Sequence, residues 1–462
     1  MAGDYRTGSD DALLRETFAA LDLPDSALDR VLVVGHEHLP SCFAVTDLAV
    51  ASIGAAGASV AELVGTLVPT PEVEVDRRLA SLWFGWSIVP DGWRLPDPWD
   101  ALAGDYPSAD GWIKIHTNVP RHRAAALDAL GCAPDREAVA RSVAARPGVE
   151  VETVVTDAGG CAAELRTTEA WATHPQGRAV AAEPVVLRDR AATTELTRWT
   201  PTPEAPLSGI RVLDLTRVIA GPVATRFLAG FGAEVLRVDP SDWHEPALEP
   251  EVLLGKRCTR LELRDDRDRR TFERLLSGAD VLVHGYRRRG LDGLGLDADA
   301  RQRIRPGLID VSLDAYGHSG PWADRRGFDS LVQFATGIAA AGMERTSSST
   351  PVSLPVQALD HATGYLVAAE VVGAIRRAAD DGRTERARLS LARTARLLVD
   401  HRGTPTVEPL RPVDDADVAV AVERTPWGPA RRLWPPVRLG SAEMAWPSPA
   451  TTLGSSAPEW SA

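Results

Sequence analysis

Residues 207–240 read LSGIRVLDLTRVIAGPVATRFLAGFGAEVLRVDP, and this stretch decides the fold class. The short apolar run 210–215 is typical of a buried parallel strand. A turn containing Ala220-Gly221-Pro222 follows, and then a helix is expected over 223–231, ending at Gly232. The run 233–238 predicts the next strand. A strand, a helix and a second strand in this order predict a βαβ unit.

Two later apolar runs, 279–284 and 308–313, predict further strands with helices between them. Together the segments predict an α/β fold with a Rossmann-like parallel sheet. The sequence disfavours a dinucleotide site, because the first turn has one glycine and no GxGxxG pattern. Arg217, Val218 and Ile219 are too bulky for a backbone that must approach a pyrophosphate closely.

Charge and hydropathy limit the classes of partner that the protein can bind and indicate whether it crosses a membrane. The chain has 462 residues, 64 of them Asp or Glu and 51 Lys or Arg, for a net charge of −13. This balance argues against a nucleic-acid or membrane-surface binder, since both partners are polyanionic. The most apolar run, 48–63, is interrupted by Glu62 and predicts a buried helix, not a membrane span. The first residues are acidic and polar and resemble no export signal, so a cytoplasmic protein is expected.

Four cysteines lie far apart, with no Cys/His cluster at zinc spacing. We expect reduced thiols and neither a metal nor a redox cofactor.

Composition predicts four segments. Residues 1–190 hold most of the tryptophans. Residues 191–206 are rich in Pro and Thr and predict a linker. Residues 207–400 contain the predicted sheet. Residues 401–462 are rich in Pro, lack periodicity, and predict an extended tail that either wraps the protein or stays loose.

The chain also contains a weak internal repeat. Leu39-Pro40 precedes Asp47, a helix of small residues and an amphipathic segment, and Leu354-Pro355 precedes Asp360 and the same succession. Ala-rich helices look alike, so the similarity reflects either chance or a duplication.

Several segments of 206–364 together resemble family III CoA-transferases, the group that includes carnitine CoA-transferases, formyl-CoA transferase and α-methylacyl-CoA racemase. Any one segment is a weak signal, but their shared order is a strong one. The segments are 206–222, 232–240, 255–258, 279–287 with 294–296, 316–321 with 326–329, and 359–364.

The first 190 residues resemble the other half of this family. Residues 110–116 and 158–162 look like its small α+β domain, and 171–176 look like the return to its large domain. Family members place these segments after the Rossmann part, whereas here they precede it. The resemblance implies two partial copies in rearranged order, which together supply about one protomer. Family members form interlocked dimers, so either a homodimer or closure within one chain is compatible with the sequence.

The resemblance implies that Asp360 attacks an acyl-CoA thioester and that CoA then passes through an aspartyl thioester to a small carboxylic acid. Asp360 precedes or begins a helix, where the dipole and free N–H groups favour a carboxylate and an oxyanion. Gly364 is expected to leave room for a pantetheine arm. An N-cap is the alternative role for Asp360, and Asp47 is expected to be a cap or a vestige.

The CoA thioester is expected as a substrate, with no separate cofactor. Its phosphates and adenine require cations and an aromatic platform. The positions that match the CoA-contacting stretches of the family are Arg217, Val218, Arg237, Lys256, Arg257, Tyr286 and Arg287. The run Arg287-Arg288-Arg289 has a solvated surface turn as its alternative reading.

Two other functions compete with CoA transfer. Racemase members have a histidine where this chain has Phe328, and a phenylalanine cannot exchange a proton, which disfavours an acyl-CoA racemase or epimerase. A non-catalytic homologue that binds acyl-CoA is the other alternative. His361 is expected to be a surface residue, with an acid–base role as the alternative. His116, His122 and His174 are expected to be structural, with substrate contact as the alternative.

Overall fold

The structure is a computed structural model that describes residues 8–193, 196, 198–287, 289–401 and 408–461. Positions 194, 195 and 197 of the expected linker, position 288 and the tail residues 402–407 lie outside the described part. The largest element of the structure is a seven-stranded sheet of order β10-β9-β8-β11-β12-β13-β7. The strands are β7 (Leu187–Thr193), β8 (Arg211–Leu215), β9 (Glu234–Asp239), β10 (Arg257–Arg260), β11 (Val281–His284), β12 (Ile309–Asp314) and β13 (Arg383–Ser390).

Six strands of this sheet are parallel, and β7 pairs antiparallel with β13. The four strands predicted within 210–313 form within one or two residues of their expected bounds. The predicted Rossmann-like sheet is therefore confirmed. Strand β7 extends into the first residues of the expected linker. The chain runs from β8 to β9 and β10 on one side and then crosses back from β10 to β11 on the other side of β8. The sheet therefore has a switch point between β8 and β11, where a ligand crevice is expected.

Alternating side chains cover the two faces of the sheet. Val212, Val281 and Val283 join the core beneath α10 (Ala220–Gly230) and α16 (Ala358–Asp381). Their neighbours along the strands pack with Phe272 of α12 (Asp266–Ser277) on the opposite face. The remaining helices of this half are α11 (Glu249–Val252), a 3₁₀ turn η1 (Asp292–Leu294), α13 (Ala298–Ile304), α14 (Asp329–Ala335), α15 (Ile338–Thr346) and α17 (Leu391–Asp400).

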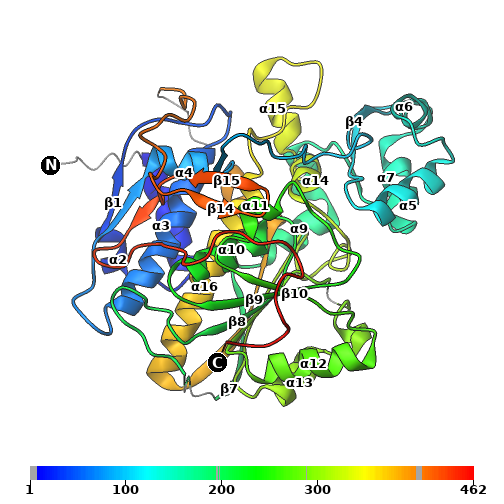
Figure 1. Cartoon of the computed structure of the whole chain (residues 1–462). Coiled ribbons are helices and arrows are strands. Elements are labelled where there is room, and N and C mark those ends of the chain that lie inside the picture. The colour runs from blue at the N-terminus through cyan, green and yellow to red at the C-terminus, as the bar shows by residue number, and fades with distance from the viewer. Residues whose placement is uncertain (1–7, 194–195, 197, 288, 402–407, 462) are drawn as a thin grey trace.

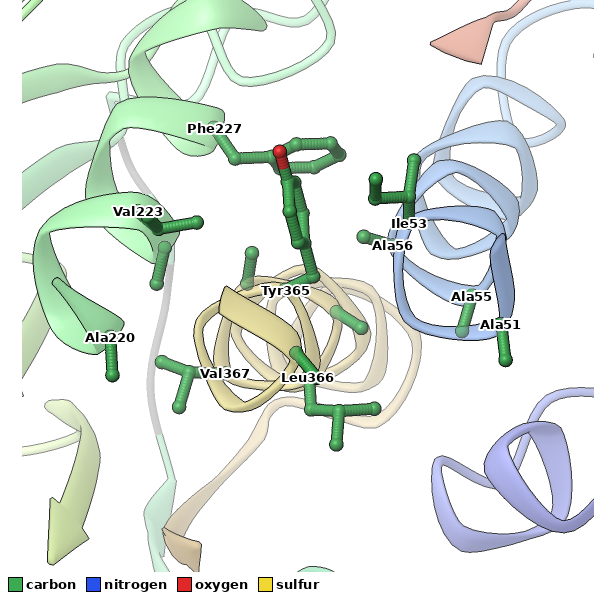
Figure 2. Close-up of a cluster of buried hydrophobic side chains, with 14 of the residues drawn as sticks. Ala51, Ile53, Ala55, Ala56, Ala220, Val223, Phe227, Tyr365, Leu366 and Val367 are labelled. Atoms are coloured by element: carbon green, nitrogen blue, oxygen red, sulfur yellow. The ribbon is translucent and has the colours of Figure 1, made fainter. Parts of the chain in front are cut away.

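The first part of the chain does not form a separate core. Helix α3 (Val45–Val64) packs along α16, and the two helices share one hydrophobic cluster with α10. Figure 2 shows Tyr365 of α16 between Phe227 of α10 and Ile53 of α3. The Tyr365 and Phe227 rings meet edge to face with centroids 5.8 Å apart. Helix α3 is long and apolar enough to cross a membrane, but 94% of its apolar window is buried inside the protein.

A small α+β unit projects from this body and has its own core (Figure 1). It consists of the antiparallel sheet β4 (Gly104–Pro107), β5 (Trp112–Ile115) and β6 (Ala162–Glu164) with α5 (Pro120–Leu130), α6 (Arg136–Ala144) and α7 (Gly148–Asp157). The expected smaller α+β domain is therefore present. Helices α8 (Thr168–Thr173) and α9 (Pro175–Ala182) lead back to β7.

The described tail wraps the N-terminal elements. Strand β14 (Glu423–Thr425) pairs with β15 (Gly428–Arg432), which pairs with β3 (Ile88–Pro90). Strand β16 (Val437–Arg438) pairs with β2 (Val73–Asp76), which also pairs with β1 (Val31–Val34). Figure 1 shows these red strands beside the blue helix α4 (Arg77–Trp83). Helices α1 (Gly8–Ala20) and α2 (Asp25–Asp29) complete this region.

The internal repeat has a structural counterpart. The order α3, β2, α4 matches α16, β13, α17, and each strand is paired in parallel with an earlier one. Asp47 and Asp360 are each the third residue of their helix. The residues before the helices have nearly the same backbone, with φ −76° and ψ 56° at Ala44 and φ −76° and ψ 63° at Gln357. The matching backbone geometry at the starts of the two helices favours a duplication over chance as the origin of the repeat.

Candidate active site

Asp360 lies at the floor of a cavity of about 580 Å³ at the switch point of the large sheet. Its side chain is in the first turn of α16, and the residue is only 8% exposed. No described cation lies within ion-pair distance of its carboxylate. The cavity walls come from the turn after β8, the turn after β11, the segment before α14, and the start of α5 in the small unit.

A second carboxylate supports Asp360 from behind. The Asp329 side chain is buried and accepts the backbone N–H of Asp360 at 2.9 Å. It also accepts the side-chain amide of Gln333, whose oxygen in turn receives the Leu354 N–H at 2.7 Å. These bonds tie the loop before α16 to α14, which fixes the position of the first turn.

Both carboxyl groups have a raised proton affinity, and Asp329 contributes to that of Asp360. Burial raises the pKa of Asp360 well above its ordinary value, and the neighbouring Asp329 raises it further. Burial also raises the pKa of Asp329 to about 6, against the lowering effect of its hydrogen bonds. A carboxylate with a raised pKa is a stronger nucleophile once it is ionised, because basicity and nucleophilicity increase together.

The expected oxyanion donors of α16 are already occupied. The N–H groups of Ala358 and His361 bond to the carbonyls of Val356 and Gln357, and those of Leu359 and Asp360 bond to Asp329. The expectation of free N–H groups beside Asp360 is therefore wrong.

Helix α10 offers free N–H groups instead. Ala220 and Gly221, at the amino end of α10, line the cavity, and no hydrogen bond between described residues uses their N–H groups. The first turns of α10 and α16 touch, since a Cβ on Gly364 would lie 2.4 Å from the Ala220 carbonyl oxygen. Gly364 thus allows two helices to approach and does not leave room for a pantetheine arm.

Arg217, Val218, Tyr286 and Arg287 line the cavity, as expected for four of the proposed CoA contacts. The Arg217 guanidinium lies over the rings of Trp243 and Tyr286, at 4.8 and 5.2 Å from their centroids. It also donates to the Tyr286 hydroxyl at 3.0 Å. Trp243 was not identified from the sequence, although it completes an aromatic wall suited to a purine ring.

Val218 has a left-handed backbone with φ +67°, which is strained for a β-branched residue. Its N–H donates to the buried Glu245 carboxylate at 3.0 Å, and this bond holds the turn in place. Arg237 pairs with both Glu245 and Asp239 beneath the turn. Arg237 is fully buried and lies outside the cavity, so it supports the turn after β8 from behind.

Lys256 and Arg257 also lie outside the cavity. The buried Lys256 ammonium donates to Asp214 at 3.1 Å and to the Pro222 carbonyl at 2.9 Å, which ties β8 to α10. Arg257 pairs with Glu234 at 3.3 Å on the edge of the sheet. The charges of both residues are satisfied by the protein, and this leaves the proposed CoA contacts to the four residues that line the cavity.

The small unit closes the cavity opposite the sheet. The ring of His116 stacks on Phe328 at 3.8 Å between centroids, and His122 meets the same ring edge-on at 6.0 Å. Phe328 directly precedes Asp329, so the contact lies close to the carboxyl pair. His174 accepts the Gln176 N–H at 3.1 Å as the cap of α9 and has a structural role.

His361 is not a surface residue, contrary to the expectation from sequence. It is 4% exposed and stacks on Phe84 of the N-terminal half at 5.3 Å. Burial lowers its pKa to about 3, so it is a neutral packing residue at physiological pH.

The counterpart of Asp360 in the first repeat has a different environment. The Asp47 carboxylate is buried and ion-paired with Arg77, the first residue of α4. The first residue of the matching helix α17 is Leu391, which lines the cavity. A cation thus neutralises the carboxylate in the first repeat, whereas the second repeat leaves its carboxylate facing open space beside an apolar side chain.

Comparisons with known proteins agree with this geometry. Residues 207–411 match the model of CoA-transferase family III. An acyl-CoA transferase of Gibberella moniliformis is 30% identical over 298 residues, which cover 59% of this chain and 52% of that protein. The succinate–glutarate CoA-transferase of Agrobacterium fabrum is 33% identical over 189 residues, covering 37% of this chain and 47% of that protein.

Among solved structures, a CAIB/BAIF family protein from Brucella suis is 25% identical, with a TM-score of 0.38, over 49% of this chain and 65% of that one. The chain spans about half the length of the two curated relatives described above. The matching segment contains the large sheet from β8 to β13, the aromatic wall and both carboxyl residues of the cavity. This segment is similar to CoA-transferase family III.

Proposed function

We propose that this protein is a CoA-transferase that moves coenzyme A between an acyl-CoA and a small carboxylic acid. The observation that carries the proposal is the Asp360 carboxyl, which lies at the floor of the cavity with no described cation paired to it and with Asp329 behind it. The aromatic and cationic wall of Arg217, Trp243 and Tyr286 suits the nucleotide end of CoA. The CoA thioester is a substrate, and the proposed chemistry uses no other cofactor.

In the first half-reaction, the Asp360 carboxylate attacks the thioester carbonyl carbon. A C–O bond forms, the C–S bond breaks, and CoA leaves as a thiolate, which gives an aspartyl–acyl anhydride. The thiolate then attacks the Asp360 carbonyl carbon, forming an aspartyl-CoA thioester and releasing the acyl group as a carboxylate. An acceptor carboxylate reverses both steps and leaves as its CoA thioester.

The protein supplies orientation and charge for these steps. The bonds from Asp329 fix the backbone of Asp360, and the N–H groups of Ala220 and Gly221 are the available donors for the tetrahedral oxyanion. Phe328, Leu391 and Ala315 line the cavity and exclude water from the reactive anhydride. Both halves of the chain contribute to the site, so we propose that a single chain suffices.

An intermediate trap tests the proposal. Full-length protein is mixed with acetyl-CoA, succinyl-CoA or glutaryl-CoA, quenched and digested, and the peptide containing Asp360 is analysed by mass spectrometry. A CoA-derived or hydroxylamine-sensitive adduct on that peptide is expected. The Asp360→Asn protein is expected to fold normally and show no adduct.

The first repeat provides the matched control, because Asp47 is at the same helix position. The Asp47→Asn protein is expected to form the adduct on Asp360 in its folded fraction. Binding of CoA without an adduct for any thioester would contradict the proposal and favour a non-catalytic acyl-CoA-binding protein.

A further inference from the structure

A second cavity, of about 340 Å³, lies against the face of the large sheet that points away from α10 and α16. His284, Ser312 and Arg388 line it from the adjacent strands β11, β12 and β13. Ser312 pairs in register with both of the others, so the three side chains form one row on one face of the sheet. The other face of the same strands belongs to the main hydrophobic core. The cavity therefore has a row of polar side chains at its floor.

Two arginines of this cavity share one carboxylate oxygen. Arg386 and Arg388 of β13 both donate to Oδ2 of Asp189, at 2.8 and 2.7 Å. Their Nε–H groups are buried and have no acceptor in the part of the chain that the structure describes. A third arginine, Arg287, lines the same cavity, and its contact with the Asp324 carbonyl oxygen is a long one of 3.4 Å. These guanidinium groups exceed the carboxylate charge paired with them, which favours an anionic ligand.

His284 adds an unused acceptor to the same cavity. It is 8% exposed, its Nε2 atom lies 3.4 Å from a carboxylate oxygen of Asp310, and no described group partners its Nδ1 atom. Burial lowers the pKa of His284, so the ring is neutral at pH 7. The Asp310 carboxylate can only accept, so it favours the ring hydrogen on Nε2 and leaves a lone pair on Nδ1. A ligand that donates one hydrogen bond would satisfy this atom.

The other charged groups of the cavity do not cancel its excess of arginines at the floor. Arg301 is neutralised by Asp310 at 2.6 Å. The His318 Nε2–H donates to the Leu389 carbonyl at 2.9 Å, and its Nδ1 lies 3.2 Å from an Asp314 oxygen. One proton must therefore lie between Asp314 and His318, and the pair has no net charge. The remaining lining carboxylates are exposed to solvent, which screens them: Asp292, Asp297 and Asp299.

A phosphate group matches both kinds of unused atom. Its charged oxygens accept hydrogen bonds from guanidinium and hydroxyl groups. At pH 7 inorganic phosphate also keeps at least one P–OH group, which can donate to the Nδ1 lone pair of His284. Sulfate has the same tetrahedral shape but no hydrogen, and a carboxylate likewise only accepts. An anion that cannot donate therefore leaves the buried Nδ1 atom unsatisfied.

We propose that the second cavity is a phosphate-binding site, in which the arginines of β13 and Ser312 donate to the phosphate oxygens and His284 accepts from the phosphate hydroxyl. This site is separate from the proposed CoA transfer and does not depend on it. Tyr286 and Arg287 line both this cavity and the one that holds Asp360. Free phosphate and a phosphate group carried by CoA are therefore the two sources that an experiment must distinguish.

Calorimetric titration of sodium phosphate and sodium sulfate into the full-length protein, at pH 7 and matched ionic strength, tests the proposal. Phosphate is expected to bind about tenfold more tightly than sulfate, because sulfate cannot donate to Nδ1. The Arg388→Gln protein is expected to lose about tenfold to a hundredfold in phosphate affinity, because a charge-assisted hydrogen bond is removed. Arg383→Gln is the matched control, since Arg383 lies on the same strand, is exposed and lines neither cavity.

The His284→Phe protein tests the acceptor separately. It keeps a ring at this position but has no Nδ1 atom, so both ions are expected to bind with similar affinity. Three results would overturn the proposal: no measurable phosphate binding, equal affinities of the wild-type protein for phosphate and sulfate, or equal losses in the Arg388→Gln and Arg383→Gln proteins.

The source of the phosphate follows from the same titration in saturating CoA or dephospho-CoA. Phosphate affinity that neither compound changes would support free phosphate as the ligand. A loss with CoA but not with dephospho-CoA would support the site and assign it to the 3′-phosphate of CoA. A loss with both compounds would place the phosphate ion in the cavity that holds Asp360 and refute the proposal. None of these measurements requires turnover, so their outcome is independent of the test of CoA transfer.

Discussion

The two matching aspartates of the repeat, Asp47 and Asp360, are expected to respond in opposite ways to replacement by asparagine, both in stability and in turnover. Asp47 is buried and paired with Arg77, so Asp47→Asn removes a carboxylate that pairs with a buried cation. Breaking such a pair costs about 3–5 kcal/mol. This corresponds to a decrease of on the order of 5–10 °C in the melting temperature, and turnover per folded molecule is expected to be unchanged.

Asp360→Asn removes a carboxyl group whose pKa is raised by burial and by Asp329. A carboxyl with a raised folded-state pKa binds protons more tightly in the folded state, so its ionisation lowers stability as pH rises above the unfolded value. The substitution is therefore expected to raise the melting temperature at pH 7–8, to have a vanishing effect near pH 4, and to abolish turnover.

Thermal unfolding and steady-state CoA transfer, measured on both variants at several pH values, provide the assay. Joint replacement of Asp47 and Arg77 by leucine serves as the rescue, because removing both charges leaves neither unpaired. The reasoning is refuted if Asp47→Asn is as stable as the wild type and inactive, or if Asp360→Asn is unstable and active.

Three further substitutions test the site and the core. Asp329→Asn removes the charge beside Asp360, so the acid limb of the pH–kcat/KM profile is expected to move to lower pH. Gly364→Ala places a Cβ 2.4 Å from a carbonyl oxygen of α10 and is expected to lower the free energy of unfolding in urea by about 1–3 kcal/mol. Gly111→Ala is the control, because its Cβ would have no atom within 4 Å and stability should not change. Glu251→Gln leaves two buried arginines, Arg226 and Arg432, without their shared carboxylate. The free energy of unfolding is expected to fall by about 3–5 kcal/mol, and proteolysis of the tail is expected to be faster. An unchanged midpoint of urea unfolding would contradict this.

Local sequence patterns predicted the centre of the sheet because those strands are continuous apolar runs. The strand at 211–215 and the helix from Ala220 follow from hydrophobic period and turn residues alone. Strand β7 was missed, because its sequence LRDRAAT is polar and its pairing with β13 depends on residues almost two hundred positions away. The tail strands were missed for the same reason, since their partners are β3 and β2 near the other end of the chain.

The charge of a residue could be read from the sequence, but its burial could not. Arg237 lies within β9 and Lys256 directly precedes β10, and each is buried with a carboxylate as its partner. His361 adjoins the proposed nucleophile but faces Phe84 of the other repeat. Asp329 belongs to a recognised motif, and its role became visible only through its bond to the Asp360 N–H.

The repeats explain why one chain with two equivalent aspartates has a single candidate site. Strand β2 lies in a three-stranded sheet with β1 and the tail strand β16, which offers no turn like those after β8 and β11. Without such a turn, a carboxylate at Asp47 would be buried with no ligand to balance it, and Arg77 provides that balance within the protein. At Asp360 the sheet provides one wall of the cavity and the small unit provides the opposite wall, so Leu391 can replace the arginine and the carboxylate stays available for chemistry. The cost of an unpaired buried carboxyl is thus confined to the one repeat whose aspartate lines the cavity.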